Sequence, residues 1–161
     1  MCGRLLRLAY LTLLVAPMSL APEISQAGHT AMSQQADGTI AYVGFMHTKK
    51  LARQVRLYPS TYKDHGAKQI PTGKFKYHIN AVLFDADSHK RITNAEVRAR
   101  VAPLGFGGSF KLLEPMLTAG VIEYCDYLDI RPSHRYRVDL SIKIPGRPNE
   151  IRMRFDHELP E

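Results

Sequence analysis

The chain of 161 residues has no tryptophan and only two cysteines, Cys2 and Cys125. Cys2 belongs to an N-terminal segment that we expect to be removed on export, which would leave Cys125 as the single thiol. One cysteine cannot form an internal disulfide, and C-x-x-C redox or zinc motifs are excluded. We interpret Cys125 first as a small buried hydrophobe, and the alternative is a soft metal ligand or an intermolecular disulfide.

The sequence also lacks the motifs of an enzyme. Gly105–Ser109 is rich in glycine, but no Gly-Lys-Ser/Thr follows it, so it does not match a phosphate-binding loop and is interpreted as a flexible connection. Ser109 lacks the G-x-S-x-G pattern of a nucleophile elbow. Asp85 and Asp87 flank a turn, where we expect them to accept backbone hydrogen bonds. We therefore predict that the protein is not an enzyme.

No apolar run is long enough for a comfortable membrane span. Leu8–Ala16 is the main one, and a transmembrane helix needs about 20 residues. Arg4 and Arg7 precede this run, and Ser25-Gln26-Ala27 offers the small residues of a signal-peptidase site. The pattern predicts a cleaved signal peptide (1–27), a flexible tail (28–38) and one domain (39–161), exported to the periplasm.

Acidic residues are in deficit, with 15 Asp and Glu against 22 Lys and Arg, a formal net charge of +7. Loss of Arg4, Arg7 and Glu23 removes one net positive charge and leaves about +6. Basic residues such as Arg98 and Arg100 occupy alternate positions of predicted strands, so we interpret them as solvated sheet faces. For an exported protein we predict no nucleic-acid partner, and we assign the charge to solubility or to attraction toward an anionic membrane or protein.

Alternation of apolar and polar side chains is the clearest structural signal present. It predicts antiparallel strands with one buried face that begin at Phe75, Asn94, His134 and Asn149. Pro145–Asn149 is predicted to be the turn between the last two strands, which gives a C-terminal hairpin. The residues predicted to be buried are Val97, Val101, Val138, Leu140, Ile142, Met153 and Phe155. Further strands are predicted at Thr39–Phe45, Phe110–Leu113 and Val121–Leu128.

The stretch Met46–Lys74 is harder to interpret. Leu51, Val55 and Leu57 fit a short helical turn or an edge strand, and prolines and glycines favour a loop over most of the rest. About seven short strands without a strong amphipathic helix predict an all-β fold, a single immunoglobulin-like antiparallel β-sandwich.

A family resemblance points to the same fold. Tyr77–Val101, Leu113–Met116 and Tyr136–Asp139 resemble small exported immunoglobulin-like domains of the YtkA-like and FixH-like kind, and periplasmic proteins with a YHxxVALFD…RITDAxVxARV…LEPM pattern. The resemblance covers most of the chain from about Tyr42 onward. It implies the fold, export, and an association with copper or other metal handling and with respiratory-complex maturation. His89 occupies a turn position where such relatives usually have glycine, which predicts another turn type.

Exported copper proteins use histidine and methionine, because imidazole and thioether suit copper where thiols are oxidised. Loops held by a rigid scaffold are where sites occur. The predicted metal ligands are therefore His47, His65 and His78, then Met46 and Met116, and His157 at the end of the last strand.

Each candidate has a second interpretation. His78 could be a structural histidine with both ring nitrogens paired. Met116, which we expect in a polar loop, could pack over the open end of the sandwich. Met153 is in phase with the core residues of its strand and is assigned to the core. His29 directly follows the predicted new terminus and could bind copper together with the free amine.

These observations predict a periplasmic binding protein that handles copper or another metal ion as an accessory protein or chaperone. The predicted partners are the metal ion and a membrane or respiratory-complex protein, and copper is the one cofactor considered. The alternative is a structural or protein-interaction β-sandwich without metal. Three or more of the candidate side chains within about 5 Å of a common point would favour metal binding.

Overall fold

The computed structural model describes residues 32–67, 69–131 and 135–158. The predicted signal peptide, His29 and the predicted strand start at His134 lie outside these residues. The described chain forms eight strands and two short helices: β1 (Met32–Ala36), β2 (Thr39–His47), α1 (Thr48–Leu57), α2 (Lys63–Ala67), β3 (Lys76–Asp85), β4 (Glu96–Pro103), β5 (Lys111–Thr118), β6 (Val121–Asp129), β7 (Tyr136–Lys143) and β8 (Ile151–His157). Neither helix is long and apolar enough to cross a membrane.

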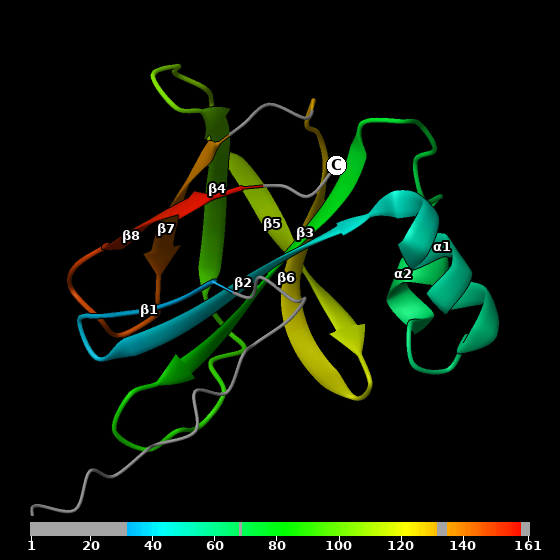
Figure 1. Ribbon diagram of the computed structural model, residues 1–161. Coiled ribbons are helices and arrows are strands. Elements are labelled where there is room, and N and C mark those ends of the chain that lie inside the picture. Colours follow the sequence, from blue (N-terminus) through cyan, green and yellow to red (C-terminus); the bar gives the residue numbers. More distant parts are fainter. Residues whose placement is uncertain (1–31, 68, 132–134, 159–161) are drawn as a thin grey trace, which may run out of the picture.

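All strand pairs are antiparallel, in the order β1-β2-β3-β6-β5-β4-β7-β8 (Figure 1). β5 joins the two parts of the sheet. Its residues 111–113 pair with β4, and its residues 114–118 pair with β6. The backbone N–H of Arg154 on β8 donates to Oε1 of Gln34 on β1 at 3.0 Å, so the two edge strands approach each other. The result is a nearly closed all-β sheet around one apolar core.

The predicted alternation is confirmed in the strands around this core. Six of the seven residues predicted to be buried are buried, and Val101 is partly buried against the core. Predicted strands at 75, 94 and 149 correspond to β3, β4 and β8, which begin one or two residues later. The inner face also receives Tyr77, Ile79, Ala81, Leu83 and Tyr124.

The first strand lies where we predicted a flexible tail, and that prediction is wrong for residues 32–36. Asp37 and Gly38 both have positive φ, 45° and 68°, and make the tight turn that folds β1 back along β2. Most of β1 is exposed and polar. An edge strand of this kind carries no apolar alternation, so its pairing depends on the turn.

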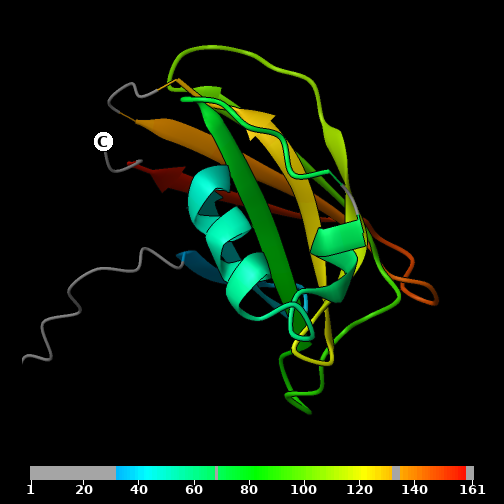
Figure 2. The ribbon, with the colours of Figure 1, turned by 90° about the vertical axis from the view of Figure 1, so that its right-hand side faces the viewer.

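The segment predicted to be mostly loop contains both helices. The imidazole of His47 caps α1, since its Nδ1 accepts a hydrogen bond from the backbone N–H of Lys49 at 3.1 Å. Leu51 of this helix is buried. Figure 2 shows α1 and α2 on the outer face of the sheet, beside β3 and β6. They therefore cover the face of the sheet that is turned away from the core.

Two further predictions need correction. His89 has a φ of 54°, the left-handed conformation that glycine favours, so a histidine at this position does not require the other turn type that we predicted. Met116 lies within β5 and is buried, because the strand continues through Pro115 instead of ending in a loop. Asp85 behaves as predicted and accepts a hydrogen bond from the backbone N–H of Ser88 at 2.9 Å.

We expect Leu140→Ala to lower the free energy of unfolding by roughly 2–5 kcal/mol, because it leaves a cavity in the core. Leu140 is 1% exposed on β7, between β4 and β8. The matched control is Leu112→Ala, since Leu112 is 52% exposed and its loss should change stability by less than about 0.5 kcal/mol. Chemical denaturation of both variants measures the difference, and equal effects would contradict this core assignment.

Candidate metal centre

The outer face of β3 and β6 carries several polar side chains, and His78 and Cys125 among them are buried. His78 pairs with Tyr127 across the two strands, and Asn80 pairs with Cys125. Directly opposed residues share a face, and side chains two positions apart return to it. This face therefore brings an imidazole, an amide, a thiol and a phenol together under the helices.

Helix α2 is fixed to β5 at the free edge beyond the last β4–β5 pair. The carboxylate of Asp64 accepts a hydrogen bond from the backbone N–H of Leu117 at 2.7 Å, and the carbonyl of Thr61 accepts one from Ala119 at 2.8 Å. Nε2 of His65 lies 3.1 Å from the hydroxyl oxygen of Thr118. These contacts hold His65 over the outer face of the sheet.

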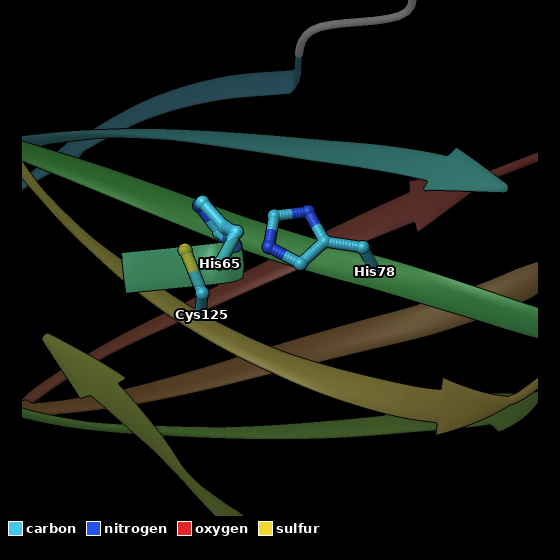
Figure 3. A group of neighbouring side chains, drawn as sticks. All are labelled: His65, His78 and Cys125. Carbon is cyan, nitrogen blue, oxygen red and sulfur yellow. The ribbon is translucent and has the colours of Figure 1, made fainter. Parts of the chain in front are cut away.

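His65, His78 and Cys125 form a buried cluster at this position (Figure 3). One potential ligand atom from each residue lies within 4.8 Å of the others. The two imidazole rings are 4.8 Å apart between centroids and nearly perpendicular, at 78°. In Figure 3 one ring nitrogen of His78 points toward the Cys125 sulfur and the His65 ring. Ligands of one ion at about 2.0–2.3 Å lie about 3.5–4.5 Å apart, so a small inward movement of the side chains would complete a site.

Two nitrogens of this cluster have no hydrogen-bond partner although they are buried. They are Nδ1 of His65 and Nε2 of His78, and the two residues are 1% and 5% exposed. A buried polar atom without a partner costs about 1–3 kcal/mol and calls for an explanation such as an ion. The hydroxyl of Tyr127, whose ring centroid lies 5.6 Å from that of His78, is also unpaired. The residues present fit a metal ion.

The electrostatics of the cluster favour neutral imidazoles. Burial, followed by the neighbouring His65, lowers the pKa of His78 to about 3. Burial also lowers the pKa of His65, an effect that Asp64 partly offsets. Both rings therefore keep a lone pair at neutral pH. Burial, then the charges of Glu123 and Asp126, raises the pKa of the Cys125 thiol, so a metal ion bound by this sulfur would have to displace its proton.

A pocket of about 250 Å³ leads from the surface to the histidines. His65 and His78 are in its wall, whereas Cys125 is not. The remaining lining comes from β2, α1, the residue before α2, β3 and the β5–β6 hairpin. It consists of Gly44, Phe45, Met46, Leu51, Tyr62, Asn80, Thr118 and Glu123. An ion that enters the pocket would thus meet the imidazoles before the thiol.

The structure separates the predicted ligands into two groups. His65 and His78 lie together, and Met46, which pairs with His78 across β2 and β3, lines the same pocket. Met116 is buried on β5 opposite Glu123, on the same face of the sheet.

The other two predicted ligands lie elsewhere. Nε2 of His47 is 3.0 Å from the carbonyl of Lys74, and its Nδ1 caps α1, so both ring nitrogens already have partners. His157 is buried at the end of β8, where its ring stacks on Phe45 at 5.4 Å between centroids. Neither belongs to the cluster of His65, His78 and Cys125.

Sequence reasoning placed Cys125 among the buried hydrophobes, and the structure places it beside two histidines. It is fully buried, as that interpretation requires. Period-two spacing puts Glu123, Cys125 and Tyr127 on one face of β6. These three polar side chains on one face were the only indication in the sequence of a site on β6. They did not predict that β6 pairs with β3, which brings Cys125 close to the histidines.

Comparisons with known proteins support the fold only. No protein-family model matches the chain, and no curated protein matches it. The structure is similar to the crystal structure of a DUF4426 family protein from Pseudomonas aeruginosa, with a TM-score of 0.57 and 17% sequence identity over 80% of this chain and 94% of that chain. The likeness extends across nearly the whole of that domain and agrees with a β-rich fold.

Proposed function

We propose that the protein binds one transition-metal ion, copper first, through His65, His78 and Cys125. The observation that carries this proposal is the pair of buried, unpaired imidazole nitrogens beside a buried thiol. A purely structural cluster would satisfy these nitrogens with protein partners. In the apo protein the cluster costs stability, and a bound ion would recover that cost.

The ligand set supports copper among the available metals. Thiolate and imidazole together suit copper and zinc, and a soft thiolate favours Cu(I). Zinc prefers four ligands in a closed tetrahedral site. The cluster has three, and Cu(I) accepts low coordination numbers. Burial of the site also restricts access of water and oxidants to the thiol.

We also propose the setting of this site. The two parts of the sheet that meet at β5 would be the two layers of an immunoglobulin-like sandwich, and the strand order supports this, with β1-β2-β3-β6-β5 in one part and β5-β4-β7-β8 in the other. The N-terminal segment supports export to the periplasm, where the protein would act as a metal-binding accessory rather than an enzyme. Its partner there would be a membrane or respiratory-complex protein that receives the metal.

The test is metal analysis of protein purified from the periplasm, followed by anaerobic titration with Cu(I) against a competing chelator. We expect one copper per chain, with a thiolate-to-Cu(I) charge-transfer absorbance in the near ultraviolet that saturates at the same ratio. Zinc should bind more weakly in a parallel titration. A wild-type protein that takes up no copper above nonspecific levels would end the proposal.

Glu123 is expected to speed the passage of the cation through the pocket. Its carboxylate lies in the pocket wall and accepts a hydrogen bond from Nδ2 of Asn80 at 3.2 Å. Gly44 leaves room for that amide, since a Cβ at Gly44 would lie 2.5 Å from Oδ1 of Asn80. A fixed negative charge on the path raises the local concentration of a cation, by about tenfold or more in a confined site.

Glu123→Gln should therefore slow Cu(I) uptake by about tenfold and change the equilibrium affinity little. Stopped-flow absorbance at the thiolate band measures the rate. The matched control is Glu96→Gln, which removes the same charge from β4, where Glu96 pairs with Arg98 at 3.1 Å. Equal uptake rates in the two variants would show that Glu123 has no part in access.

A further inference from the structure

All the charged residues of α1 are cationic, and they lie on its outward face. The helix contains four basic residues and no acidic one: Lys49, Lys50, Arg53 and Arg56. Leu51 faces the sheet and is 1% exposed, whereas all four basic side chains are exposed. The spacing of Lys49, Arg53 and Arg56 by three and four residues places these three charges along one stripe.

A groove runs beside this stripe. It has a volume of about 480 Å³ and lies between α1 and residues 72–74. Lys49, Arg53 and Arg56 line one side, and Lys74 lines the other. No carboxylate is present in the lining. A concave site walled by charges of one sign concentrates their field, so the groove is suited to an anion of the size of a phosphate headgroup.

These cations differ in their pairing from several arginines on and beside the sheet. Arg100 and Arg154 both bind Asp139 at 2.7 Å, and Arg147 binds Asp85 at 2.8 Å. Within the part of the chain that the structure describes, the four basic residues of α1 and Lys74 make no ion pair. Five unpaired positive charges at one edge of the molecule leave a field that an external anion can neutralise.

Two apolar side chains complete the surface. Leu57 and Tyr58 directly follow Arg56 at the end of α1 and are 54% and 55% exposed. A basic stripe beside an exposed aliphatic and an aromatic side chain is the combination found at lipid interfaces, where cations meet phosphates and the apolar groups enter the headgroup layer. An acidic protein segment would require the charges but not these two side chains.

We infer that the cationic face of α1, with Lys74 across the groove, docks the protein on an anionic lipid surface. Lipid phosphates would occupy the groove, and Leu57 and Tyr58 would enter the headgroup layer. Each basic residue near such a surface contributes about fivefold to partitioning, and the effect falls within a Debye length of about 10 Å at 0.1 M salt. The inference rests on α1 and does not depend on metal binding.

The experiment is sedimentation of the protein with vesicles of phosphatidylcholine alone or of phosphatidylcholine mixed with phosphatidylglycerol. Wild-type protein should bind only the mixed vesicles, and rising NaCl should release it. Arg53→Gln/Arg56→Gln should reduce partitioning by about 25-fold, at about fivefold for each charge. The control is Arg98→Gln/Arg152→Gln, which removes two exposed arginines from the sheet and should cost only a few-fold. Circular dichroism confirms that each variant is folded.

Three results would overturn the inference. Wild-type protein could fail to bind the mixed vesicles, or the two double variants could lose equal amounts, which would reduce the effect to net charge. As a third result, soluble polyglutamate could bind the protein as tightly as the vesicles do at equal charge concentration. The Leu57→Ser/Tyr58→Ser variant would then bind both polyglutamate and vesicles as tightly as wild type. That outcome would assign the groove to an acidic polypeptide. Inorganic phosphate distinguishes a lipid surface from free phosphate as the ligand. If it releases no more protein from the mixed vesicles than NaCl of equal ionic strength does, the result supports the lipid surface.

Discussion

Replacing Cys125 by alanine or serine is expected to lower Cu(I) affinity by more than about 100-fold, because the change removes the only thiolate of the cluster. Loss of a supporting residue around a metal ligand costs about 10–100-fold, and loss of the ligand itself should exceed that range. Alanine introduces no polar atom at this fully buried position, whereas serine adds a hydroxyl that needs a partner. Both variants should lose the near-ultraviolet charge-transfer absorbance.

The matched control is Tyr127→Phe. Tyr127 lies on the same face of β6, and its hydroxyl is buried without a partner, so its removal should leave the fold and the copper affinity nearly unchanged. Copper binding to wild type should also release about one proton, since burial raises the pKa of the thiol and keeps it protonated when the site is empty. A Cys125→Ala protein with wild-type affinity would remove the thiol from the site.

Most of the sheet could be predicted from the sequence, and the reason is periodicity. Residues of β8 alternate strictly between buried and exposed positions, and apolar residues occupy alternate positions of β7, so the sequence of each strand indicates which face meets the core. The edge strand β1 does not, because it is largely exposed and is held by a turn. The prediction of no strong amphipathic helix is wrong for α1, whose inner face consists of Thr48, Leu51, Ala52 and Val55. This face was missed because the helix has only ten residues and two of these four side chains are small or polar.

The site was predictable only in part. His65 and His78 were chosen for residue type and for their position near an irregular segment, and the structure brings both together. What the sequence could not provide is the β3–β6 register, which places Cys125 opposite Asn80. Nor could it show that His47 caps a helix, since the cap requires α1. Long-range pairing and tertiary contacts, rather than local patterns, decide which candidate side chains meet.

His78→Leu is expected to change two properties in opposite directions. It removes a ligand, so Cu(I) affinity should fall by more than about 100-fold. It also removes a buried nitrogen that has no partner in the apo protein, so the free energy of unfolding of the apo protein should rise by about 1 kcal/mol. A site residue that costs stability until its ligand arrives behaves in this way.

His47→Ala is the matched control because it is expected to show the reverse pattern. Both ring nitrogens of His47 have partners, and one of them caps α1. Its loss should lower the free energy of unfolding by about 0.5–2 kcal/mol and leave copper affinity unchanged. Thermal or chemical denaturation of the apo proteins and Cu(I) competition titrations on the same samples give both readouts. If His78→Leu were destabilising and still bound copper like wild type, His78 would be a structural histidine, and the metal centre would have to be abandoned.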